Sequence, residues 1–244
     1  CSGVILVGHS AGGWLGRAAM GFGSDSSNGN SNEEADTEKD DSSDSSPSGP
    51  SVDLSKILGI VSLGAPHLPP PPDVMDMTRG ALRITNEQFP GSFHMPEQQI
   101  FYLTVIGNTI QGEQQQRSSP FEPTTVKGFA YNSYEAVCGD GTTVGDGVVP
   151  VCSAHLEDAQ QLDLDGVLHS INAPDNWYGS TGVIDRWHTP MLVQLKERIV
   201  QKQKQKQEQQ KRSIVGVGGA VPLPAASGLF DALSNAVNSW STKP

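Results

Sequence analysis

A serine flanked by glycines stands near the start of the chain and is the residue best placed for chemistry. Gly8-His9-Ser10-Ala11-Gly12 follows the apolar run VILV at 4–7, and the helix-compatible sequence LGRAAM comes next. A buried parallel strand has such an uninterrupted apolar run, and G-x-S-x-G between strand and helix is the nucleophile-elbow pattern. This pattern predicts a strained, nucleophilic Ser10, and we expect a Cβ at Gly8 or Gly12 to collide with the strand or the helix. The alternative is a Gly-rich turn with a bystander serine.

A serine hydroxyl is a weak nucleophile and requires a general base that a carboxylate orients. After a nucleophile elbow the partners follow in the order Ser, acid, His. Asp146, in the turn GDGVVP, and His169, at the end of LDLDGVLHS, fit this order. Asp140 in the similar turn GDG is the second candidate acid, although Asp-Gly is also a common turn dipeptide. His188 is the second candidate base, but we expect it on a long helix from which it does not reach the elbow.

The remaining site predictions concern the oxyanion hole and the other histidines. The backbone N–H of Ala11, directly after the nucleophile, is the predicted oxyanion donor. We interpret His67, His94 and His155 as loop or surface residues, and we expect the side chain of His9 to pack beside the sheet.

Four motifs carry a resemblance to a known family. GHSAGG after a short apolar strand, followed by LGAPH, GDGVVP and LDGVLHS, resembles the α/β-hydrolase superfamily. The resemblance is to its lipase- and esterase-like branch, most closely the plant and algal plastid-type hydrolases, and covers about residues 3–23 and 57–190. It implies a mostly parallel sheet with helices on both faces, and a Ser-His-Asp triad that cleaves carboxylic esters, with lipid or acyl esters as substrates. It also implies an intracellular protein, with a plastid as one possible compartment.

The beginning of the chain departs from the family pattern. It lacks an initiator methionine and starts one or two residues before the elbow strand, whereas in the family the elbow follows the fifth strand. We therefore interpret the chain as the C-terminal half of an α/β-hydrolase fold. The resemblance implies that the second oxyanion donor and any targeting segment belong to the missing half.

Composition limits the partners. The net charge is −11, and residues 24–50 alone hold eight acidic groups and one lysine. We expect no nucleic-acid partner, since that would require a basic face, and no transmembrane helix, since no run of 18 apolar residues occurs. Contact of residues 228–240 with a membrane surface stays open.

Cys1, Cys138 and Cys152 form neither a disulfide framework nor a metal-ligand cluster. We expect Cys138 and Cys152 to be two buried free thiols, and predict no cofactor or metal; the oligomeric state is not indicated.

The expected organisation is one partial α/β domain, residues 1–200, followed by a flexible low-complexity tail, residues 201–244. Residues 24–50 read as a disordered acidic insertion, with a phosphorylatable tract as the alternative. A proline run makes residues 67–99 a long, cap- or lid-like connection. Strands are predicted at 57–63, 100–106 and 161–168, and helices at 11–22, 150–159 and 180–200.

The predicted function is that of a serine hydrolase working through an acyl-enzyme. One alternative is acyl transfer on the same triad, in which an alcohol replaces water. The other is a catalytically inactive hydrolase fold that serves as an interaction protein, with the acidic insertion as its docking tract.

Overall fold

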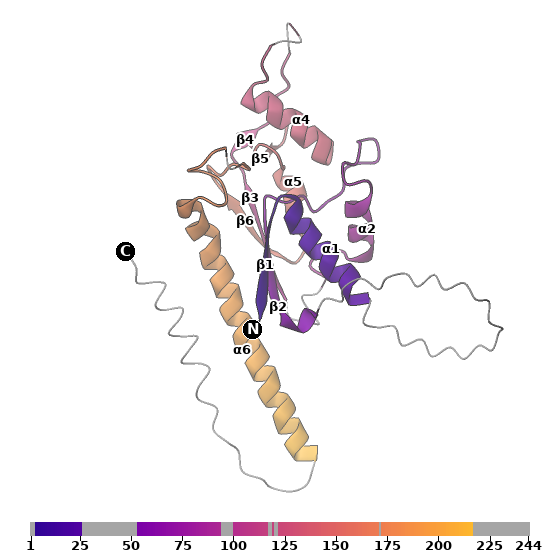
Figure 1. Ribbon diagram of the computed structural model, residues 1–244, viewed down its shortest axis with the longest axis vertical. Helices are drawn as coiled ribbons and strands as arrows, with labels where there is room; N and C mark the ends of the chain where they lie inside the picture. The colour runs from indigo at the N-terminus through magenta and orange to yellow at the C-terminus, as the bar shows by residue number, and fades with distance from the viewer. Residues whose placement is uncertain are drawn as a thin grey trace, which may run out of the picture. The chain divides into compact units, whose positions relative to one another are not determined.

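The structure is a computed structural model that describes residues 3–25, 53–93, 100–116, 119, 122–170 and 172–216. Its main sheet consists of four parallel strands: β1 (Val4–His9), β2 (Ile57–Leu63), β3 (Phe101–Gly107) and β6 (Gln160–Leu164). They lie in the order β1-β2-β3-β6 (Figure 1). Parallel neighbours require crossover connections, and helices lie in these connections. The predicted α/β class with a parallel sheet is confirmed.

Side chains alternate along the strands and build a core on each face of the sheet. On one face Val61 packs in a cluster with Trp187 of α6 (Thr181–Gly216). On the other face Ile60 packs in a cluster with Met20 of α1 (Ala11–Asp25). Successive strand residues point to opposite faces, so a strand covered on both sides is apolar throughout. Figure 1 shows the strands between α1 and the first turns of α6.

Strand β1 lies at one edge of the described sheet, where it pairs with β2. Val4 and Val7 of this strand are 42% and 51% exposed. Within the described residues no further strand pairs with the other side of β1. An apolar edge strand is a hazard for aggregation.

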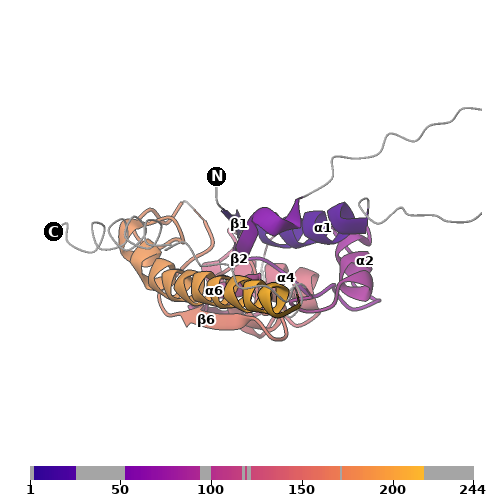
Figure 2. The same ribbon diagram turned by 90° about the horizontal axis from the view of Figure 1, so that it is seen from below.

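Shorter elements fill the connections. The 3-10 helix η1 (Leu54–Lys56) precedes β2, and α2 (Ala81–Gln88) lies between β2 and β3. Between β3 and β6 come α4 (Val126–Cys138), α5 (Val151–Ala154) and an antiparallel pair, β4 (Ile110–Gln111) with β5 (Val144–Gly145). Because β4 follows β3 after two residues, this pair holds the end of β5 close to the carboxyl end of β3. Figure 2 shows the same elements from below.

The predicted boundaries agree with the structure at the buried strands and differ elsewhere. The strands predicted at 57–63 and 100–106 match β2 and β3 to within one residue. The strand predicted at 161–168 already ends at Leu164, and the helix predicted at 150–159 is only the single turn α5. Helices α1 and α6 run past their predicted ends, to Asp25 and Gly216.

Helices α2 and α4 are not predicted by the sequence analysis. Helix α4 nevertheless carries an end signal on each side: the Thr125 side chain accepts a hydrogen bond from the Gly128 N–H at 3.0 Å, and Gly139 adopts φ 79°. A threonine N-cap and a left-handed glycine after the last turn are preferred helix termini. Helix α2 lies inside the predicted cap-like connection 67–99, of which 94–99 lie outside the described residues.

Two predicted segments lie largely outside the described residues. The acidic insertion predicted at 24–50 is described only through Asp25, and the tail predicted from 201 only as the end of α6. The chain divides into two compact units, residues 1–201 and 202–244. None of the helices in the described ranges combines the length and the apolar character needed to cross a bilayer.

Cys138 and Cys152 are free thiols that contact each other. Burial is the main cause that raises the pKa of Cys138 to about 11, and the contact with Cys152 acts in the same direction. The expectation that both thiols are buried is wrong, because Cys138 is only half-buried and Cys152 is exposed. The short helix α5 turns Cys152 toward solvent and buries its neighbours Ser153 and Ala154 instead.

Candidate active site

Ser10 occupies a strained turn between β1 and α1. Its backbone has φ 54°, a left-handed value that non-glycine residues rarely adopt. Two main-chain hydrogen bonds hold the turn: the Ser10 N–H donates to the Leu63 carbonyl at 2.9 Å, and the Gly13 N–H donates to the Ser10 carbonyl at 3.0 Å. Such strain persists only where the surroundings determine it, and it is typical of functional sites. The turn presents the half-buried Ser10 at the carboxyl end of the sheet, where ligands bind in open α/β sheets.

The glycines of the elbow do not share one role. A Cβ at Gly8 would lie 2.4 Å from the main chain of Gly12, so the prediction for Gly8 agrees with the geometry. A Cβ at Gly12 would meet nothing within 4 Å, and the predicted collision there is wrong. Gly13 is the second tight position, since its Cβ would lie 2.5 Å from the Ala65 Cβ. The first turn of α1 touches the end of β2 through Gly13, while Gly12 faces open space.

The three residues indicated by the order Ser, acid, His form one hydrogen-bonded chain. The His169 Nε2 lies 3.1 Å from the Ser10 Oγ, and the His169 Nδ1 lies 2.8 Å from the Asp146 Oδ2. A carboxylate only accepts hydrogen bonds, so Nδ1 carries the ring proton and Nε2 accepts from the hydroxyl. This is the tautomer that a general base needs.

The Asp146 carboxylate is fully buried. Its Oδ1 accepts the N–H groups of Val148 and Val149, at 3.0 and 2.7 Å. The Tyr134 hydroxyl accepts the Gly147 N–H at 2.8 Å and so ties the turn to α4. A buried carboxylate is costly unless such donors compensate it. The turn GDGVVP thus provides the acid and two of its own hydrogen-bond donors.

His169 lies in the loop beyond β6 and is held by its main chain as well as by its ring. The His169 N–H donates to the Asp146 carbonyl at 3.0 Å. The preceding Leu168 N–H donates to the Asn176 carbonyl at 2.7 Å, which fastens the loop to the segment before α6. The His169 side chain is 11% exposed. The main-chain bonds and the bond to Asp146 therefore fix the position of the imidazole, and its Nε2 faces the serine.

His9 belongs to the site, which the sequence analysis missed. Its Nε2 donates to the His169 carbonyl at 3.0 Å, and the two ring centroids are 4.7 Å apart. Burial, and then the charge of His169, lower the pKa of His9. The expectation that His9 packs beside the sheet is thus incomplete, because its ring reaches across the sheet end to the loop beyond β6. Its position next to the nucleophile was the available signal.

Ala11 is the first residue of α1, as expected for the oxyanion donor. The first four N–H groups of a helix have no acceptor within the helix, and they lie at the positive end of its dipole. The Ala11 amide is therefore positioned to receive negative charge beside Ser10. Among the described residues, no three His, Cys, Asp or Glu side chains gather as metal ligands would.

The competing candidates lie elsewhere. Asp140 is exposed and uses its carboxylate to accept from the N–H and hydroxyl of Thr142, at 2.8 and 2.6 Å. His188 is on α6, as expected, with its ring edge-on to that of Trp187. His94 lies outside the described residues.

Two histidines pair with hydroxyls inside the protein. His67 lies in a loop, as predicted, but it is fully buried rather than at the surface. Its Nε2 is 2.8 Å from the Ser62 Oγ, and its Nδ1 is 3.3 Å from a guanidinium nitrogen of Arg17. The half-buried His155 follows α5, and its ring joins Thr104 to Asp163, at 2.8 Å on each side.

No protein-family model, curated protein or solved structure matches this chain.

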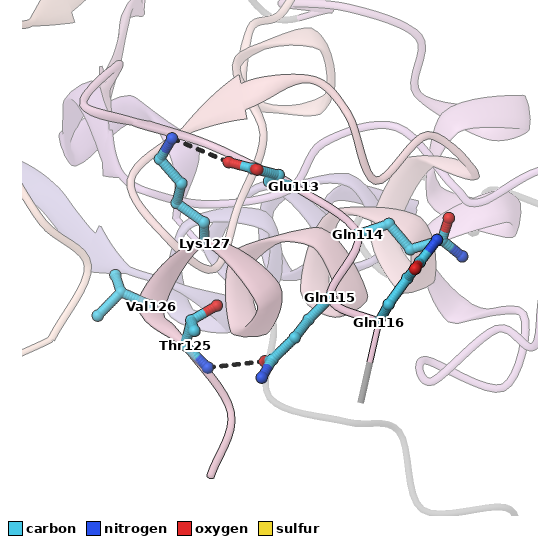
Figure 3. A pocket seen from close by; sticks show the side chains of 7 residues that line it. All are labelled: Glu113, Gln114, Gln115, Gln116, Thr125, Val126 and Lys127. Carbon is cyan, nitrogen blue, oxygen red and sulfur yellow. Dashed lines mark hydrogen bonds and ion pairs between the residues drawn. The ribbon is translucent and has the colours of Figure 1, made fainter. Parts of the chain in front are cut away.

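A separate pocket lies at the start of α4. It has a volume of about 420 Å³, and Figure 3 shows the residues around it: Glu113, Gln114, Gln115, Gln116, Thr125, Val126 and Lys127. Within its lining an ion pair joins the Lys127 Nζ to the Glu113 Oε2 at 3.0 Å, and the Thr125 N–H donates to the Gln115 Oε1 at 2.8 Å. None of the triad residues lines it. The candidate active site therefore rests on the hydrogen-bond geometry around Ser10.

Proposed function

We propose that this chain is a serine hydrolase of the α/β-hydrolase type that cleaves carboxylic esters through an acyl-enzyme. The observation that carries the proposal is the chain of hydrogen bonds from the Ser10 hydroxyl through His169 to Asp146. The three residues come from separate connections: Ser10 follows β1, His169 follows β6 and Asp146 follows β5. Lipid or other acyl esters are the proposed substrates, in line with the resemblance of the motifs.

Comparison with the two other hydroxyl–imidazole pairs supports the choice of Ser10. Ser62 and Thr104 are each only 1% exposed, so no substrate carbonyl reaches their hydroxyls. The imidazole beside Ser62 faces Arg17, a cation that opposes proton uptake by the ring. Of the three hydroxyl–imidazole pairs in the described residues, only the one at the elbow combines an accessible hydroxyl with an imidazole whose second nitrogen faces a carboxylate.

The first half of the proposed reaction forms the acyl-enzyme. The Ser10 Oγ attacks the ester carbonyl carbon while its proton passes to the His169 Nε2. The carbonyl π electrons move onto oxygen, and the Ala11 N–H stabilises that oxyanion. The oxyanion electrons then re-form the C=O bond, the C–O bond to the alcohol breaks, and the doubly protonated imidazole gives its Nε2 proton to the leaving oxygen. Asp146 stabilises the imidazolium without taking its proton.

The second half repeats these steps with water. His169 takes a proton from a water molecule, which attacks the acyl carbon, and returns that proton to the Ser10 Oγ as the carboxylic acid leaves. The hydrogen-bonded elbow turn holds the Ser10 Oγ at the same place in both halves. If an alcohol takes the place of water, the product is a new ester, which is the acyltransferase alternative.

Turnover of p-nitrophenyl esters of increasing acyl length tests the proposal on the full chain. We expect the wild-type chain to hydrolyse these esters. The rate should fall by several orders of magnitude in Ser10→Ala, as it does for triad serines, and should be retained in Ser62→Ala. A preference for longer acyl chains would support lipid esters. Added glycerol distinguishes the alternatives, because an acyltransferase would form glyceryl ester at the expense of free acid. No Ser10-dependent turnover of any ester would contradict the proposal and favour an interaction protein.

A further inference from the structure

The Asp146 carboxylate accepts one hydrogen bond that a Ser-His-Asp triad does not require. Besides the two backbone N–H groups on Oδ1 and His169 on Oδ2, the Tyr178 hydroxyl lies 2.8 Å from Oδ2. Two unrelated donors, an imidazole and a phenol, therefore share one oxygen. An ionised carboxylate offers about four acceptor sites, and all are taken. The carboxylate cannot rotate without breaking at least one of these bonds.

The direction of the phenol proton follows from a second hydrogen bond. The Gly107 N–H, at the end of β3, donates to the Tyr178 hydroxyl oxygen at 2.9 Å. An amide N–H can only donate, so the hydroxyl accepts there and gives its own proton to Asp146. Burial, and then the charge of Asp146, raise the pKa of Tyr178 far above its ordinary value. The hydroxyl thus stays protonated and remains a donor.

Tyr178 is held rigidly. It is fully buried in the core cluster between the sheet and α6, and its carbonyl accepts from the Trp187 indole N–H at 2.9 Å. The segment before it bridges to residue 168, next to His169. The same short segment therefore supports both the acid and the base. Two series of hydrogen bonds therefore converge on Asp146, one from the Gly107 N–H through the Tyr178 hydroxyl and the other from the Ser10 hydroxyl through His169.

We propose that Tyr178 is a positioning residue of the triad, whose hydroxyl orients the Asp146 carboxylate and withdraws charge from the oxygen that faces His169. The inference rests on the proposed hydrolase function. Tyr178 touches no reacting atom and acts through Asp146. Less charge on Oδ2 means less stabilisation of the protonated imidazole, so Tyr178 keeps His169 available as a base at lower pH.

Tyr134 provides a matched control. It is equally buried, and its hydroxyl also makes two hydrogen bonds, donating to the Ile110 carbonyl at 2.9 Å and accepting from Gly147 at 2.8 Å. It supports the same turn but does not contact the carboxylate. Tyr134→Phe and Tyr178→Phe therefore remove comparable buried groups, and only the second changes the donors on Asp146.

The experiment measures the rate at which a fluorophosphonate modifies Ser10 as a function of pH. In Tyr178→Phe we expect the modification rate on the high-pH plateau to fall roughly tenfold or more, because the Asp146 carboxylate is no longer held in its orientation. We also expect the low-pH decline of the rate (the acid limb of the pH profile) to move to higher pH by about half a unit or more. Replacing Tyr178 by 3-fluorotyrosine, a stronger donor of the same shape, should shift the acid limb to lower pH.

The other titratable groups facing the site are His9 from β1 and Tyr134 from α4. His9 is present in every variant, and burial raises the pKa of Tyr134, so it stays neutral across the acid range.

The two levels of the proposal can fail separately. An unmodified Ser10 in the wild-type chain would overturn the hydrolase function. A modified wild-type Ser10 with the same acid limb in Tyr178→Phe and Tyr134→Phe would overturn the role of Tyr178. The proton NMR resonance of the His169 Nδ1–H gives a readout without activity: it should move in the 3-fluorotyrosine protein, which keeps the fold, and not in Tyr134→Phe. An unmoved resonance would also overturn the inference.

Discussion

The His9 ring donates a hydrogen bond to the main-chain carbonyl of His169, and the two imidazoles lie 4.7 Å apart. This contact joins the elbow to the loop that carries the proposed base, directly beside the nucleophile. The His9 ring also lies 5.6 Å from the ring of Tyr178 in the same connection, so it helps to fix the distance between the elbow and the loop beyond β6.

Loss of this contact should reduce activity without abolishing it. We expect His9→Ala to lower kcat/KM roughly tenfold, because the base is then held less firmly, while His9→Gln, which retains a donor, keeps most of the activity. Steady-state ester hydrolysis measures the effect, with His188→Ala on α6 as the control histidine. Equal rates for His9→Ala and the wild-type chain would mean that the contact has no positioning role.

Two adjacent glycines of the elbow should respond oppositely to alanine. In Gly13→Ala the new Cβ collides with Ala65 and Ser62, at 2.5 and 2.8 Å, and we expect a loss of about 1–3 kcal/mol in the free energy of unfolding. In Gly12→Ala nothing lies within 4 Å, and alanine favours a helix by about 0.5–1 kcal/mol. Urea denaturation of both variants tests this, and a larger loss at Gly12 would contradict the elbow geometry.

Gly64 should be essential for the position of the acid as well as for stability. It has φ +56°, and a Cβ there would lie 2.7 Å from the Asp146 Oδ2 and 2.9 Å from the Tyr178 hydroxyl. Gly80 also has a positive φ, +87°, but open space around it. Both alanine variants should lose about 1–2 kcal/mol of stability for the left-handed backbone, and Gly64→Ala should lose about 1–3 kcal/mol more for the collision. Only Gly64→Ala should also lose most of its ester turnover, and equal turnover in the two variants would refute the proposed role of the carboxylate.

The buried His67 should make the protein sensitive to acid. Burial first, and then the Arg17 and His155 charges, lower its pKa to about 3, from 6.5. Between these two values the unfolded chain binds a proton that the native state does not. The stabilisation is therefore complete above about pH 6.5 and falls as the pH drops through this window, by roughly 2 kcal/mol between pH 7 and pH 5.

His67→Gln isolates this contribution. Glutamine can still accept from Arg17 and donate to Ser62 but does not titrate. We expect a flatter dependence of unfolding free energy on pH in the variant than in the wild-type chain, measured by urea titrations at pH 7, 6 and 5. Parallel curves would show that His67 does not govern acid stability.

The residues that sequence could indicate are those with a local pattern. The apolar run before Ser10, the Asp-Gly turn at Asp146 and the histidine after a strand each follow from neighbours in the chain. The structure joins these three. The buried strands β2 and β3 could also be predicted from sequence, because each is apolar on both faces and ends at a clear break in the apolar run.

Features that depend on the packing of distant segments could not be read in this way. Tyr178 stands in the segment NWYGS, which has no periodicity, and its partners Gly107 and Asp146 come from other connections. Gly12 and Gly13 look equivalent in sequence, and only the approach of β2 distinguishes them. The sequence analysis placed His67 in a loop or at the surface, because nothing near it in sequence reveals that Arg17 of α1 packs against its ring.

The central claim is that the hydroxyl of Ser10 is activated by His169 and Asp146. The most direct measurement treats the full chain with a fluorophosphonate and locates the adduct by peptide mass mapping. We expect one adduct, on the peptide that contains Ser10, absent in Ser10→Ala and formed on the order of 10³ times more slowly in His169→Gln. An adduct on another residue, or none in the folded wild-type chain, would contradict it.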